Sequence, residues 1–226
     1  MVYATDELER LEGIERSIED ALWKSVINED YEKALAEYEK AKKDLELMES
    51  KTGDVEREQK RLLSYCIMRI NDALEYLERS EGSIERAEES LKLAKESQDV
   101  VQILRSKLAL GVALLNLGKL PEAESHFTEI ILQTQDESEN NDMIQVYGWT
   151  LIVRVDILLG KSLYNQAKEL ANQALGVLSG INNYAGLRTA CSLLSRIYQS
   201  EGNIEKSESY KERSEQYANL AKEHRQ

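Results

Sequence analysis

A nine-residue phrase that occurs twice sets the strongest limit on what this chain can fold into. It reads SEGSIERAE over residues 80–88 and SEGNIEKSE over residues 200–208, and six of the nine positions are identical. The glycine in third place favours the left-handed backbone that ends a helix, and the Ser or Asn after it is a good N-cap for the next helix. An isoleucine then opens an apolar stripe, and three residues later Ala87 or Ser207 lies on the same helix face. The phrase therefore predicts a corner between two helices, with a small residue that lets them approach closely.

The same corner recurs in looser form over residues 29–38, 117–124 and 160–171, the last with two extra residues after Gly160. Each copy has a small residue, termed the notch, at the predicted helix crossing. The five notches are Ala34, Ala87, Ala123, Ala167 and Ser207. Because a lone helix pair cannot bury both of its faces, the chain is expected to stack successive pairs into one array.

Composition also favours helices. The 226 residues include a single proline, Pro121, which falls in the first turn of a predicted helix, where proline is tolerated. A β-sandwich or barrel of this size would need many turns, and turns recruit Pro and Gly. Apolar residues at helical spacing flank the notches, most clearly over residues 104–137.

These units resemble the tetratricopeptide repeat (TPR) family, whose repeat is an antiparallel helix pair of about 34 residues. The segment 104–137 matches the pattern best, with Gly111, Gly118, Ala123 and Phe127 at family positions. The resemblance spans nearly the whole chain, with longer and less regular spacing than the strict repeat. It implies an all-α fold, an α-α superhelix (solenoid) of about five antiparallel helix pairs, forming a single domain over residues 1–226. The implied units are approximately 15–48, 57–100, 104–137, 146–181 and 188–221.

Motifs for catalysis or for metal and cofactor binding are missing from the sequence. The letters GKS at 160–162 lack the earlier glycine and the preceding strand of a phosphate-binding loop, so they indicate a helix–helix turn. The histidines, His126 and His224, are far apart, and no CxxC, HExxH or EF-hand spacing occurs. The sequence predicts no catalytic residues, no metal and no cofactor, and so a protein that is not an enzyme.

The charge balance bears on the partners and the compartment. With a formal net charge of −13, nucleic acid and anionic membranes are not expected as partners, and no apolar run reaches the length of a membrane span. The acidity favours solubility, with attraction of a basic partner as the alternative. Cys66 and Cys191 are expected to be free buried thiols in a reducing compartment, which predicts a cytoplasmic protein.

In the TPR family the first helix of each pair lines a concave, peptide-binding face. The resemblance implies that the lining includes Trp23 in the first unit, Arg105, Leu108, Val112 and Asn116 in the third, Thr150 and Arg154 in the fourth, and Ser192 and Arg196 in the fifth. The three arginines form either a weak anion-binding row or a solvated surface. Trp23 is either a groove anchor or a terminal core residue.

The leading hypothesis is a protein–protein interaction module or scaffold that binds a peptide or helix of another protein on this concave face. Two alternatives remain open. The chain is a structural subunit of a homo-oligomer, such as a homodimer, or of a larger complex, or it is a ligand-responsive regulatory domain. Repeat folds serve unrelated purposes, so the sequence predicts a mode of binding and leaves the partner unnamed.

Overall fold

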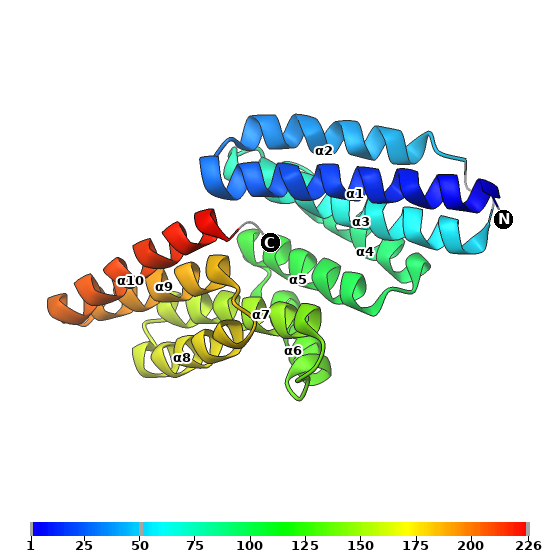
Figure 1. Cartoon of the computed structure of the whole chain (residues 1–226). Coiled ribbons are helices and arrows are strands. Elements are labelled where there is room, and N and C mark those ends of the chain that lie inside the picture. Colours follow the sequence, from blue (N-terminus) through cyan, green and yellow to red (C-terminus); the bar gives the residue numbers. More distant parts are fainter. Residues whose placement is uncertain (1, 50–51, 225–226) are drawn as a thin grey trace. The chain divides into compact units, whose positions relative to one another are not determined.

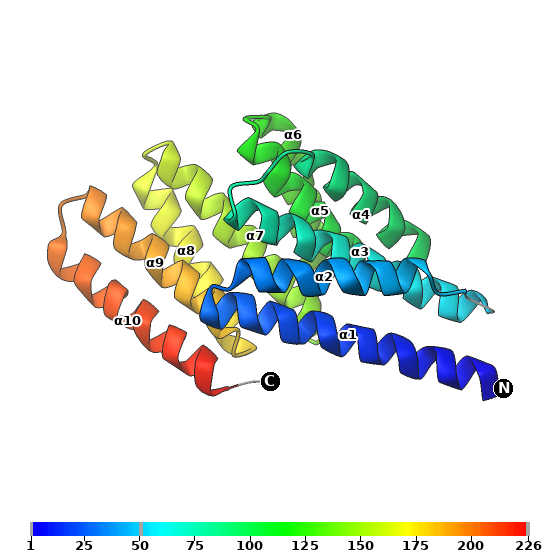
Figure 2. The same cartoon turned by 90° about the horizontal axis from the view of Figure 1, so that it is seen from above.

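The computed structural model describes residues 2–49 and 52–224, and every regular element within these ranges is an α-helix. The elements are α1 (Val2–Asn28), α2 (Tyr31–Glu46), α3 (Gly53–Tyr76), α4 (Ser83–Ser97), α5 (Val100–Asn116), α6 (Leu120–Thr134), α7 (Asn141–Gly160), α8 (Tyr164–Gly180), α9 (Tyr184–Ser200) and α10 (Ile204–Glu223). Successive helices form antiparallel pairs such as α1 with α2 and α9 with α10, which lie side by side in both views (Figures 1 and 2). The predicted all-α class with about five helix pairs is confirmed.

Several helices end in the same hydrogen-bonded turn. One residue takes a positive φ and donates its N–H to the carbonyl of the residue three positions before it. The following residue donates its N–H to the carbonyl of the residue five positions before that following residue. The residues with positive φ in these turns are Glu78, Gly118, Ser162, Asn182 and Gly202. These bonds are a Schellman ending, which satisfies the last carbonyl groups of a helix. The letters GKS therefore belong to a helix–helix turn, and its left-handed residue is Ser162.

The repeated nonapeptide behaves differently in its two copies. In the second copy, Asn203 caps α10 and accepts a hydrogen bond from the N–H of Lys206 at 3.1 Å, as predicted. In the first copy the predicted Ser83 cap is wrong, because Gly82 occupies the N-cap position and no side chain caps α4. The preceding helix also ends at Tyr76, before this phrase begins, because Glu78 already takes the left-handed conformation.

Each notch lies five residues after a residue with positive φ. The pairs are Glu29 with Ala34, Gly82 with Ala87, Gly118 with Ala123, Ser162 with Ala167 and Gly202 with Ser207. The notch side chains are 0–7% exposed. The predicted burial of small residues is therefore confirmed, and the two extra residues expected after Gly160 disappear once Ser162 is recognised as the turn residue.

The helices fall into two compact units, Met1–His126 and Phe127–Gln226. The prediction of one domain over residues 1–226 stays a prediction. In the first unit α3 is central, since it contacts α1, α2, α4 and α5. The core holds apolar side chains of α1, α2 and α3, among them Leu11, Ile18, Tyr38 and Leu62.

A polar cluster lies among α3, α4 and α5 in the first unit. The hydroxyls of Ser64, Ser90 and Ser106 lie 2.9–3.1 Å from one another, and each is 0% exposed. Ser64 Oγ donates to the carbonyl of Ser90, and Ser90 Oγ donates back to the carbonyl of Ser64. These bonds satisfy buried hydroxyls and fix how α3 crosses α4.

The core of the second unit is built around one leucine. Leu178 of α8 is 0% exposed and faces Gly148 of α7 and Gly186 of α9. A Cβ added to Gly148 would lie 2.6 Å from Leu178 Cγ, and one added to Gly186 would lie 2.7 Å from Leu178 Cδ1. Both glycines are therefore needed for this packing, because any side chain would occupy the space of Leu178.

The outward face of α10 is polar. Its exposed side chains include Glu205, Glu208, Lys211, Glu212 and Glu215, whereas Ser207 and Ala221 are buried. Within the described ranges, α7 is the one helix long and apolar enough, by length and composition alone, to cross a membrane. It packs against α8 and α9.

Candidate functional site

The turn residues give a common register for the first helices of the pairs. Counted back from the residue with positive φ, position −6 is Trp23 in α1, Asp72 in α3, Val112 in α5, Asp156 in α7 and Arg196 in α9. We define the first-helix face as positions −13, −10, −6, −3 and −2. In α5, for example, these are Arg105, Leu108, Val112, Leu115 and Asn116. Within each unit the first helices are neighbours, because α3 contacts α1 and α5, and α7 contacts α9.

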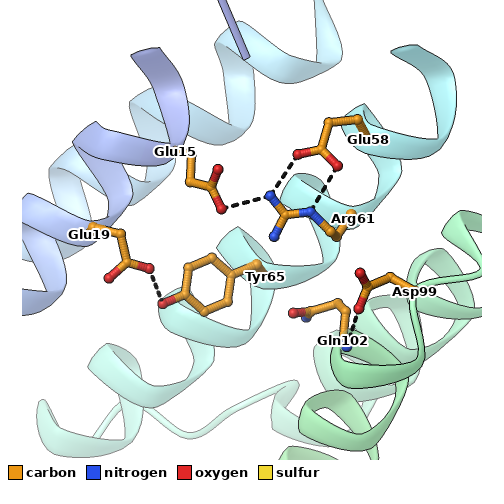
Figure 3. A network of polar contacts seen from close by, with 7 residues as sticks. All are labelled: Glu15, Glu19, Glu58, Arg61, Tyr65, Asp99 and Gln102. Carbon is orange, nitrogen blue, oxygen red and sulfur yellow. Dashed lines mark hydrogen bonds and ion pairs between the residues drawn. The ribbon is translucent and has the colours of Figure 1, made fainter. Parts of the chain in front are cut away.

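In the first unit this face carries a polar network centred on Tyr65 (Figure 3). The Tyr65 hydroxyl donates to Glu19 Oε1 of α1 at 2.6 Å. The guanidinium groups of Arg69 and Arg105 lie 5.0 and 5.9 Å from the centre of its ring. Tyr65 is 5% exposed, and burial raises its pKa above the ordinary value. Tyr65, at position −13 of α3, is therefore contacted by Arg105, at position −13 of α5, and by Glu19, at position −10 of α1.

A second group of polar contacts lies toward the beginning of α3. Arg61 donates to Glu58 of its own helix (2.9 and 2.6 Å) and to Glu15 of α1 (2.6 Å), as Figure 3 shows. Beside it lies a shallow cavity of about 460 Å³, with Asp54, Arg57 and Asp99 also in its wall. Because Arg57 is paired with Asp54, and Arg61 with two carboxylates, this cavity is lined by charges that already compensate one another.

At the other end of α3 the face is acidic. Arg69 Nη1 donates to Asp72 Oδ2 at 2.9 Å, and 41% of the Asp72 side chain is exposed. Glu75, one turn further, is half-buried, and the nearby side chain of Asn116 on α5 acts to lower its pKa. Burial raises the pKa of both carboxyls, and the charge of Asp72 raises that of Glu75 further.

In the second unit a shallow cavity of about 410 Å³ lies where α7 and α9 end. Its lining comprises Asp156, Leu159, Gly160, Arg196, Gln199 and Ser200, together with Tyr164 of α8. The first six are positions −6, −3 and −2 of the two first helices. Arg196 donates to Asp156 Oδ1 at 2.9 Å, and more than half of each side chain is exposed. An exposed ion pair of this kind contributes little to stability, so both groups remain available to a partner.

Comparisons with solved structures decide the fold. BtubC (BKLC) from P. vanneervenii superimposes with a TM-score of 0.55 at 16% identity, covering 97% of this chain and 94% of that one. The kinesin light chain TPR-like repeats of Podosopora anserina give a TM-score of 0.51 at 15% identity, covering 93% and 97%. No protein-family model matches the chain, and the search of curated proteins gives no match.

The chain has a TPR-like fold. The resemblance drawn from the notches and the predicted solenoid class are thereby confirmed. TPR-like folds generally mediate protein–protein interaction, since stacked repeats offer an extended binding surface. At these identities the likeness concerns the fold alone.

The TPR-like register shows where each predicted lining residue lies. Leu108 and Val112 are half-buried on α5, and Asn116 and Ser192 are exposed on α5 and α9. Trp23 is half-buried on α1. Arg105 lies over Tyr65, and Arg196 is paired with Asp156, so each arginine is held by its own unit.

The fourth unit needs a correction. Thr150 is 0% exposed, and its hydroxyl donates to the carbonyl of Val146 at 2.8 Å, so it does not line an open surface. Arg154 is half-buried at position −8, outside the first-helix face. The error came from treating Gly160 as the turn residue, because glycine is the usual sign of a left-handed turn and Ser162 is not. Counting from Ser162 would have selected Asp156.

Among the described residues, no cluster of three or more His, Cys, Asp or Glu side chains is arranged to hold a metal ion. The acids at the end of α3, Asp72 and Glu75, were missed by sequence reasoning. The feature that identifies them is their sequence spacing of six and three residues before Glu78, which has a positive φ. A glutamate gives no local indication of such a backbone conformation.

Proposed function

We propose that this chain is a non-enzymatic protein-binding module that holds a peptide or a helix of another protein on its first-helix face. The observation that carries the proposal is the cavity between α7 and α9, since six of its seven lining residues occupy positions −6, −3 and −2. The equivalent positions of the first unit present half-buried Trp23, Val112 and Leu115 beside charged side chains. Apolar anchors surrounded by polar groups are typical of protein-binding surfaces.

The proposal includes a cytoplasmic location. It is supported by Cys66 and Cys191, both buried as free thiols rather than joined in a disulfide. Free thiols are stable in a reducing compartment.

The test is a selection of random 12-residue peptides on the immobilised full chain, followed by affinity measurements with variants. Val112→Glu and Arg196→Glu change position −6 in the first and second unit. Lys92→Glu and Gln166→Glu introduce the same charge changes at exposed sites on the second helices α4 and α8.

We expect at least one lining variant to weaken binding about tenfold, equivalent to 1.4 kcal/mol, and both control variants to bind within twofold of the wild type. If both lining variants bind normally, or if no peptide is recovered, the proposal is refuted. Light scattering on the same samples tests self-association, because a stable dimer would favour a subunit role over peptide binding.

A further inference from the structure

Position −6 of the first unit carries a half-exposed acid on α3 and apolar side chains on the two neighbouring first helices. Asp72 on α3 has the same register as Trp23 on α1 and Val112 on α5, and α3 contacts both helices. One turn along α3, Glu75 occupies position −3, near the side chain of Asn116. The local surface thus combines two carboxylates with an indole and a branched aliphatic group.

The protein's own cations only partly compensate these carboxylates. Arg69 pairs with Asp72 at 2.9 Å, and the charge of Arg86 on α4 acts on Glu75. Even so, burial outweighs these partners, and the pKa of each carboxyl stays above its ordinary value. The ionised pair is therefore less stable than it would be in water, and an added cation would favour it.

A buried hydroxyl points to the same place. Tyr38 of α2 is 1% exposed, and its hydroxyl has no hydrogen-bond partner. The neighbouring Ser25 hydroxyl donates to the carbonyl of Leu22 instead. The charges of Arg69, Asp72 and Glu19 all act on the pKa of this Tyr38 hydroxyl, so it lies near these groups. An unpaired buried oxygen is uncommon and is able to accept a further N–H donor.

We propose that the partner of the first unit carries a lysine or arginine whose charged group is received by Asp72 and Glu75, with its alkyl stem against Trp23 and Val112. Long basic side chains have this dual character, an apolar stem with a charged end. The net charge of −13 would attract such a partner from solution. This inference rests on the proposed function, because it names the chemistry of the segment bound on the first-helix face.

The experiment compares peptides selected from one random 12-residue library on three full-length proteins. These are the wild type, Asp72→Asn/Glu75→Gln, and the control Glu88→Gln/Glu89→Gln. The control removes the same charge from exposed positions of α4. Selected peptides are then titrated against each protein in a Trp149→Phe background, in which emission reports on Trp23.

We expect Lys and Arg to be enriched in peptides from the wild type and the control, and not in those from Asp72→Asn/Glu75→Gln. In a selected peptide, replacing the enriched Lys by norleucine should weaken binding to the wild type about tenfold. The same replacement should weaken binding to the neutral variant, Asp72→Asn/Glu75→Gln, less than twofold. Equal enrichment on all three proteins would overturn the inference, because the net charge alone would then explain it.

The two proposals fail in different ways. Peptides recovered without Lys or Arg enrichment, and weakened by Val112→Glu, would leave the proposed function standing and overturn this inference. Recovery of no peptide would overturn both. The neutral variant should keep its thermal stability, because removing carboxylates whose pKa is raised in the folded state relieves an unfavourable charge.

Discussion

Replacing Gly148 with alanine should destabilise the second unit by forcing α7 away from α8. The three atoms nearest to the added Cβ all belong to Leu178, with Cγ at 2.6 Å and Cδ1 at 3.2 Å. Carbon atoms in contact normally lie about 3.5–4.0 Å apart, so the overlap is about 1 Å. Leu178 is 0% exposed and belongs to the hydrophobic core of the second unit. Overpacking of this kind costs up to about 3 kcal/mol.

A double variant tests the reasoning behind this number. Leu178→Ala alone should cost about 2–5 kcal/mol through the cavity that it leaves. In Gly148→Ala/Leu178→Ala the added methyl meets none of the atoms that caused the overlap and fills part of that cavity. The double variant should therefore be about as stable as Leu178→Ala, with a coupling energy of about 1–3 kcal/mol.

The assay is urea unfolding followed by tryptophan emission. The chain has two tryptophans, and Trp149 packs against the core of the second unit. In a Trp23→Phe background the emission therefore reports on that unit. With a slope of about 2 kcal/mol per M, Gly148→Ala should lower the midpoint by roughly 0.5–1.5 M.

Gly176 of α8 provides a matched control, because a Cβ there meets nothing within 4 Å. Gly176→Ala should raise stability by up to about 1 kcal/mol, as alanine does in helices. If Gly148→Ala is as stable as the wild type, or if the double variant loses the full sum of the two single losses, the packing argument is wrong.

Three further outcomes follow from the turns, the α6–α7 connection and the thiols. Ser162→Gly should stabilise the chain by about 1 kcal/mol and Gly202→Ser should destabilise it by a similar amount in urea unfolding, because both positions have a positive φ; equal midpoints would contradict this. Glu137 accepts hydrogen bonds from the backbone N–H groups of residues 139, 140 and 138, which lower its pKa. Its ionised form therefore stabilises the α6–α7 connection above the ordinary pKa of glutamate, and this stabilisation is lost as the pH falls through the lowered pKa. Glu137→Gln should therefore melt below the wild type at pH 7, and the two should converge well below pH 4; a constant gap would exclude this role. Burial raises the pKa of Cys66 to about 12 and also raises that of Cys191. A thiol reagent at pH 8 should therefore modify both thiols only as fast as the protein unfolds. Rapid modification of the native protein would show that the thiols are not buried.

The repeat could be predicted because its signals are local. The notch residues, such as Ala34 and Ala123, are small residues at fixed distances from a turn, and helical spacing around them is visible in a short window. The repeated nonapeptide correctly predicted the corner at residues 200–208. Asn203 is the N-cap of α10, and it follows Gly202, which takes the left-handed conformation.

The register of the fourth unit could not be predicted in the same way. A positive φ at Ser162 is imposed by the ends of α7 and α8, and a serine gives no local sign of it. The shift of two residues moved the candidates from Ile152 and Asp156 to Thr150 and Arg154.

The serine cluster and the acidic end of α3 depend on long-range packing. Ser64, Ser90 and Ser106 belong to three helices, and each alone looks like an ordinary polar residue. Likewise, Asp72 and Glu75 look like surface acids until Arg69 and Asn116 are seen beside them.

The hydrophilic outer side of α10 has a consequence for assembly. Repeat arrays lengthen when an apolar end receives the next unit, and two molecules can join in the same way. On the side of α10 that carries Glu205, Glu208 and Lys211, the surface that a second molecule would contact consists mainly of exposed charged groups. Growth of filaments from this helix is therefore disfavoured, and concentrated protein should remain dispersed at this surface.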